Sequence, residues 1–162
     1  ELKKIALEVD GVKEVEIGIS ENISLPSVYP ALDFDIPKKV MLVDDEVEFV
    51  QTLSERLQTR KYDSKIAYNG EEALASMEEE QPEVMVLDLK MPGISGFDVL
   101  REVKAKHPDT EVIILTGHGS SKEEELAYEL GAFAYLEKPV DINILSKTMN
   151  EAYAKINRGK SH

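Results

Sequence analysis

From Lys38 onward, short apolar runs alternate with amphipathic helical patterns along the whole remaining chain. This alternation is typical of βα units, because neighbouring parallel strands must be joined by a crossover that is usually a helix. The apolar runs cover residues 40–43, 64–67, 84–87, 111–115 and 133–136. The sequence therefore predicts an α/β fold with three layers, in which helices cover both faces of a doubly wound, five-stranded parallel sheet.

The helical patterns between these runs have recognisable faces and ends. Phe49, Val50, Leu53 and Leu57 recur at the spacing of one helix face. Another helix should end at the Pro that follows His107, since the residue before a proline disfavours helical geometry. The last helical pattern spans residues 141–153.

Residues 1–37 differ from the rest of the chain. A helical pattern and an alternating strand pattern fill the first 19 residues, and Pro26, Pro30 and Pro37 then break the chain into a linker. One helix and one strand cannot bury enough surface to fold alone. This appendage could pack on the main domain, pair with a second copy, or be the remnant of a larger domain. We thus divide the chain into a segment 1–37, a domain 38–157 and a tail 158–162.

Composition excludes some classes of function. The chain has no cysteine, which rules out disulfides and thiolate metal sites. No apolar stretch reaches membrane-spanning length. The net charge of −13 argues against direct binding of nucleic acid, which needs a basic stripe. We expect a cytoplasmic location and no contact with a membrane.

Acidic residues stand where two of the predicted strands end. Asp44 and Asp45 follow the first run, and Asp88 follows the third. The carboxyl ends of parallel strands meet at one edge of a sheet, where open α/β folds bind their ligands. Three carboxylates brought together disfavour one another's ionisation. The pattern therefore predicts a bound cation.

Two further polar residues complete the set, because Thr116 follows the fourth run and Lys138, with Pro139, follows the fifth. Taken singly, each has an ordinary explanation: Asp44 as a helix N-cap, Thr116 as a strand-end hydroxyl and Lys138 as a solvated charge. Together, and with the Asp-Leu-Lys-Met-Pro-Gly stretch that begins at Asp88, they resemble the receiver domain of two-component response regulators. The resemblance covers residues 38–157. It implies a flavodoxin-like sheet with strand order 2-1-3-4-5.

The resemblance also implies the roles of the acids. Asp88 would accept a phosphoryl group from the phosphohistidine of a sensor histidine kinase or a phosphotransfer protein, giving an aspartyl phosphate. Mg²⁺ would be held by Asp45, Asp88 and the backbone carbonyl of Lys90, with Asp44 acting through water. Such a chain is not an enzyme for a separate substrate, since it catalyses only its own phosphorylation and slow dephosphorylation.

Three other residues receive roles from the same resemblance. Lys138 would offer its ammonium, and Thr116 its hydroxyl, to phosphoryl oxygens. Tyr135 would be the aromatic residue that turns inward on activation, although an aromatic on a last strand can also be simple core. The peptide bond before Pro139 would be cis.

The output of such a switch would be a changed surface. The resemblance points to helix 121–130, strand 133–136 and helix 141–153, through which a downstream protein or a second copy would bind. Only residues 158–162 follow the domain, so we expect output through this surface, through the segment 1–37 or through a domain outside this chain. Two alternatives are a binding module that works independently of phosphorylation and, with less support, an enzyme that turns over a soluble phosphoester.

Overall fold

The computed structural model describes residues 36–160. The helix and strand expected in the first 19 residues, and the linker up to residue 35, lie outside this described part. Among residues 36–160, no helix combines the length and the apolar character needed to cross a membrane.

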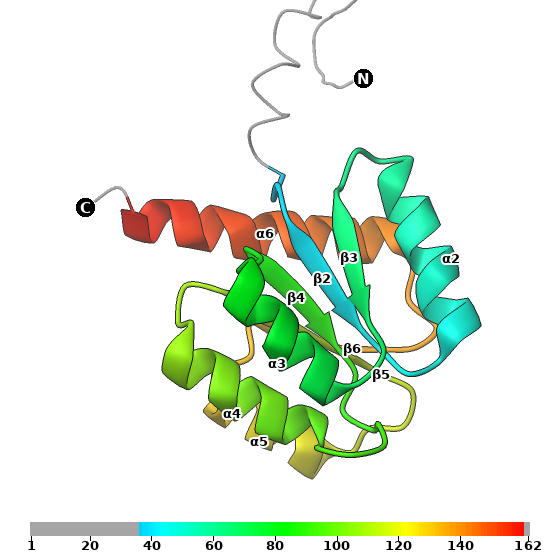
Figure 1. The fold of residues 1–162 in the computed structure, drawn as a ribbon, viewed down its shortest axis with the longest axis vertical. Coiled ribbons are helices and arrows are strands. Elements are labelled where there is room, and N and C mark those ends of the chain that lie inside the picture. Colours follow the sequence, from blue (N-terminus) through cyan, green and yellow to red (C-terminus); the bar gives the residue numbers. More distant parts are fainter. Residues whose placement is uncertain (1–35, 161–162) are drawn as a thin grey trace, which may run out of the picture. The chain divides into compact units, whose positions relative to one another are not determined.

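The described part contains one parallel sheet of five strands (Figure 1). The strands are β2 (Val40–Val43), β3 (Ser64–Ala67), β4 (Val84–Leu87), β5 (Glu111–Thr116) and β6 (Ala134–Glu137). Their order is β3-β2-β4-β5-β6, and every neighbouring pair is parallel. The predicted fold class and strand order are therefore confirmed. The last strand begins one residue later than predicted, and β5 extends to include Thr116.

Within residues 36–160, five helices cover the two faces of this sheet. They are α2 (Val47–Gln58), α3 (Gly70–Glu79), α4 (Gly96–Lys106), α5 (Ser121–Glu129) and α6 (Ile142–Lys160). Buried residues of α2 and α6 belong to one apolar cluster, and those of α3, α4 and α5 belong to a second. Alternate residues of each strand contribute to opposite clusters, since successive side chains of a strand point to opposite faces.

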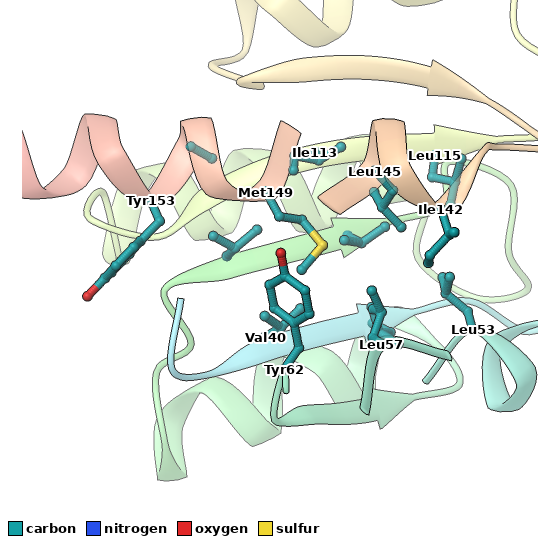
Figure 2. Close-up of a cluster of buried hydrophobic side chains, with 14 of the residues drawn as sticks. Val40, Leu53, Leu57, Tyr62, Ile113, Leu115, Ile142, Leu145, Met149 and Tyr153 are labelled. Atoms are coloured by element: carbon teal, nitrogen blue, oxygen red, sulfur yellow. The ribbon is translucent and has the colours of Figure 1, made fainter. Parts of the chain in front are cut away.

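The strands are buried on both faces, which explains why they appear in the sequence as unbroken apolar runs. All four residues of β2 and of β4 are buried. Figure 2 shows Leu145 and Met149 of α6 turned toward the strands, with Leu57 of α2 in the same cluster. This core fixes the sheet and so fixes the positions of the residues at its carboxyl edge.

Candidate functional site

The sheet brings the predicted site residues to one edge. Asp44 directly follows β2, Asp88 directly follows β4, and Lys138 directly follows β6. Thr116 is the last residue of β5. Backbone hydrogen bonds continue the sheet pattern into this edge. The backbone N–H of Asp44 donates to the backbone carbonyl of Ala67 at 3.1 Å, and the N–H of Asp88 donates to the carbonyl of Val43, the last residue of β2, at 3.0 Å. The N–H of Lys138 donates to the backbone carbonyl of Thr116 at 2.9 Å. The side chains are thus positioned by rigid strands.

The acids form a compact group. One carboxylate oxygen from each of Asp44, Asp45 and Asp88 lies within 4.8 Å of the others. Asp44 and Asp88 are buried, and Asp45 is half-buried. Hard oxygen ligands at this spacing suit a divalent cation such as Mg²⁺, and clustered carboxylates need a positive charge between them. The donor set therefore fits the predicted ion.

Lys138 supplies a positive charge beside these acids. Its Nζ lies 2.7 Å from Asp44 Oδ2, 2.5 Å from Glu46 Oε1 and 3.7 Å from Asp88 Oδ2. The ammonium also lies over the Phe49 ring, 4.4 Å from its centroid. Burial alone would lower the pKa of Lys138, but the hydrogen bonds to Asp44 and Glu46, together with the charges of Asp44 and Asp88, outweigh burial and raise the pKa. With a side chain only 12% exposed, Lys138 is not an ordinary solvated charge.

Asp44 does not cap the following helix. The N-cap of α2 is Glu46, and its side chain makes no capping hydrogen bond. Asp44 Oδ1 instead accepts from the backbone N–H of Glu46 at 2.8 Å, which turns the chain into the helix. Burial raises the pKa of Asp44, and the charge of Asp88 adds to this, although Lys138 acts in the opposite direction. The N-cap interpretation of Asp44 is therefore wrong.

Two hydroxyl groups near the acids are buried without a hydrogen-bond partner in the described part of the chain. They are Thr116 Oγ1 and the Tyr135 hydroxyl. A buried donor without a partner costs free energy, and at a functional site it is available to a ligand. Burial, followed by the charge of Glu123, raises the pKa of the Tyr135 phenol.

An open pocket with a volume of about 630 Å³ lies at this edge of the sheet. It is lined by Asp45, Glu46, Phe49, Asp88, Lys90, Thr116, Gly117, His118, Lys138 and Pro139. The Lys138–Pro139 peptide is cis. The backbone N–H of Lys90 donates to Asp88 Oδ1 at 3.3 Å, so the loop after β4 folds back over the acid.

Glu46, one of the two closest partners of Lys138, was not predicted from the sequence as a site residue. A signal was present, since Glu46 is the third consecutive acid after the first strand. Its position at the pocket became apparent only when α2 and the loop after β6 were placed together in space.

Gly96, the first residue of α4, is required by a close approach of backbones. A Cβ at Gly96 would overlap the carbonyl oxygen of Asp88 and lie 2.6 Å from the Cα of Leu89. We expect Gly96→Ala to lower the free energy of unfolding by about 1–3 kcal/mol, because the loop after β4 has to move. Urea denaturation measures this loss. A Cβ at Gly117 meets its nearest atom only at 4.0 Å, so Gly117→Ala is the control. Equal stability of the two variants would contradict the prediction.

A doubly wound parallel sheet with an acidic pocket at its carboxyl edge places this protein in the flavodoxin-like class of α/β folds. The family model for the response regulator receiver domain matches residues 40–150. The chain belongs to this family. Response regulator receivers are the signalling switches of two-component systems, and aspartate phosphorylation and Mg²⁺ are standard in the family.

Individual relatives agree with this assignment. The DNA-binding transcriptional regulator NtrC of Salmonella typhimurium is 36% identical over 123 residues, which cover 76% of this chain and 25% of NtrC. The chain thus spans about a quarter of the length of the curated relatives it matches. The CheY-like receiver domain protein of Methanospirillum hungatei JF-1 has a TM-score of 0.73 at 26% identity, covering 75% of this chain and 98% of that one.

The structure of a third relative contains a phosphorylated residue. It is a response regulator protein from Burkholderia pseudomallei with a phosphorylated aspartic acid, a calcium ion and citrate. Its TM-score is 0.67 at 27% identity, and the match covers 76% of this chain and 72% of that chain.

Proposed function

We propose that this chain is a switch that accepts a phosphoryl group on Asp88 from the phosphohistidine of a histidine kinase or phosphotransfer protein. One observation carries the proposal. The buried Asp88 carboxylate lies close to two other acids and an ammonium group, and the same pocket is lined by Thr116, whose hydroxyl has no hydrogen-bond partner among the described residues. These are the charges that phosphoryl transfer requires around its acceptor.

In the proposed reaction, a carboxylate oxygen of Asp88 forms a bond to phosphorus. The bond from phosphorus to the imidazole nitrogen breaks, and its electron pair stays on that nitrogen. Bound Mg²⁺ would neutralise charge on the phosphoryl oxygens. Asp45, Asp88 and the carbonyl of Lys90 would hold this ion, with Asp44 acting through water. The Burkholderia relative, which was solved with a phosphorylated aspartic acid and a calcium ion, supports phosphorylation of an aspartate in this fold.

Lys138 and Thr116 would bind the new phosphoryl group. Lys138 is already 3.7 Å from Asp88 Oδ2, but its shorter contacts are with Asp44 and Glu46. Its ammonium would therefore exchange part of this pairing for a phosphoryl oxygen. The Thr116 hydroxyl has no partner to give up within the described residues, so it can donate directly.

Phosphorylation would then alter the surface formed by α5, β6 and α6, to which a downstream protein or a second copy would bind. NtrC is a DNA-binding regulator, but the matched region is a quarter of its length. For this chain, the absence of direct nucleic-acid binding stays a prediction from its charge of −13.

Intact mass spectrometry tests the proposal. The chain is incubated with acetyl phosphate, with and without Mg²⁺. We expect a gain of one phosphoryl group that depends on Mg²⁺. No gain would contradict the proposed function and favour an interaction module independent of phosphorylation. The same gain after the divalent ion is chelated would contradict the proposed role of Mg²⁺.

The proposed ion site predicts a large effect of Asp45. Asp45→Asn removes one charged ligand while keeping the side-chain shape, so we expect Mg²⁺ affinity to fall by about tenfold or more, which corresponds to ~1.4 kcal/mol. Isothermal titration calorimetry measures the affinity. Asp109→Asn makes the same change in net charge at an exposed turn before β5 and serves as the control. Equal affinities of the two variants would exclude Asp45 as a ligand.

A further inference from the structure

The Tyr135 hydroxyl occupies a space that exists because residue 119 has no side chain. A Cβ at Gly119 would overlap the hydroxyl oxygen of Tyr135 and lie 2.7 Å from its Cζ. The same Cβ would lie 3.3 Å from Cγ2 of Thr116. Gly119, Thr116 and the tip of Tyr135 therefore meet at one point, between the end of β5 and the start of α5.

The backbone at Gly119 does not itself require glycine. Among the described residues, the glycines with positive φ are Gly93 and Gly131. An alanine could therefore adopt the backbone conformation of Gly119, and its methyl group would meet only the side chains around it. The nearest obstacle is the far end of one side chain, which can leave by rotating about its own bonds.

The inward position of Tyr135 is not held by a hydrogen bond within the described part of the chain. Its hydroxyl is buried there and has no partner, and the same is true of Thr116 Oγ1. Burial of a hydroxyl without a partner costs free energy. The inward and outward positions of Tyr135 should therefore be close enough in free energy for a small steric change to select between them.

We propose that Gly119 is a positioning residue that admits Tyr135 to the inward position beside Thr116. Any side chain at position 119 forces Tyr135 outward, toward the face formed by α5, β6 and α6. The tip of Tyr135 then leaves the space beside Gly119 and Thr116, while Asp88 and the other acids are untouched. The signalling consequence rests on the proposed function, but the steric role of Gly119 does not.

Two glycines of the same loop provide a matched pair of variants. Gly119→Ala adds a methyl group that overlaps Tyr135, whereas Gly117→Ala adds one whose nearest neighbour, Cδ of Lys138, is 4.0 Å away. Both variants are labelled with tyrosine carrying ¹³C at Cζ. The broadening of each tyrosine signal by a neutral soluble paramagnetic chelate then measures how exposed that ring end is. Tyr62, which is 4% exposed, and Tyr128, which is 46% exposed, serve as references.

In the wild type and in Gly117→Ala, we expect the Tyr135 signal to be protected. In Gly119→Ala we expect its broadening to increase several-fold and to approach that of Tyr128. Continued protection of Tyr135 in Gly119→Ala would overturn the proposal. Equal exposure in both variants would also overturn it, because general disturbance of the loop would then be the cause.

A second comparison covers the case in which Gly119→Ala does not fold. In a Tyr135→Leu background the obstacle is gone, so Gly119→Ala should fold there and leave the melting temperature almost unchanged. A double variant that does not fold, or the same loss of melting temperature in both backgrounds, would overturn the proposal.

Mass spectrometry with acetyl phosphate and Mg²⁺ separates this inference from the proposed function. If the switch proposal holds, the wild type and Gly119→Ala gain the phosphoryl group alike, because residue 119 does not line the pocket. If neither gains it, the proposed function fails, and the exposure of Tyr135 still decides the role of Gly119.

Discussion

Replacing Asp88 with asparagine is expected to reduce the Mg²⁺-dependent gain of a phosphoryl group to background. An amide oxygen is a poor nucleophile toward phosphorus, so the acceptor is lost. The shape of the side chain is kept, and the amide oxygen can still accept from the N–H of Lys90, as Asp88 Oδ1 does now. The backbone bond from position 88 to the β2 strand is unaffected.

The same substitution has an electrostatic signature. The charge of Asp88 contributes to the raised pKa of Asp44, so the pKa of Asp44 should fall in Asp88→Asn. Nuclear magnetic resonance titration of the Asp44 carboxyl group detects this change. A lower pKa of Asp44 in the variant would show that Asp88→Asn is folded. It would also show, without any phosphorylation, that the carboxyl groups of Asp44 and Asp88 are neighbours in the wild type.

Asp109→Asn is the matched control, because it removes the same charge from an exposed turn. This variant should gain the phosphoryl group as the wild type does. An equal gain in Asp88→Asn would show that another residue is the acceptor, and peptide mapping would then locate it.

The fold could be predicted because the buried strands appear in the sequence as apolar runs. Strands buried on both faces have to be apolar throughout, as β2 and β4 are, and each is followed by a helical pattern. The ends of helices and strands were predicted less accurately than their positions. The last helix continues beyond Tyr153 to Lys160, since Ile156 extends the same buried face by one more turn.

The site residues could be predicted where a residue type coincided with a strand end. Their contacts could not, since they depend on distances between segments far apart in the sequence. The pairing of Lys138 with Glu46 joins residues 92 positions apart. The Thr116 hydroxyl, which has no hydrogen-bond partner in residues 36–160, and the space beside Gly119 likewise depend on how β5, β6 and the loop between β5 and α5 come together.

The second large effect is expected in the core, at Leu145 of α6. Leu145 is 0% exposed and lies in the cluster between α6 and the sheet (Figure 2). Leu145→Ala removes apolar contacts and leaves a cavity that a close-packed core cannot fully fill. We expect the free energy of unfolding to fall by about 2–5 kcal/mol. Because domains are usually stable by only about 5–15 kcal/mol, this loss is a large part of the total.

The preceding residue provides the control for this prediction. Ile144 lies on the same helix but is 54% exposed, and Ile144→Ala removes the same number of carbon atoms. Its effect should stay within about 0.5 kcal/mol, because no buried contact is lost. Urea denaturation measures both variants. Equal losses would mean that α6 does not pack on the sheet through the face that carries Leu145, and the surface proposed for α5, β6 and α6 would then lose its structural basis.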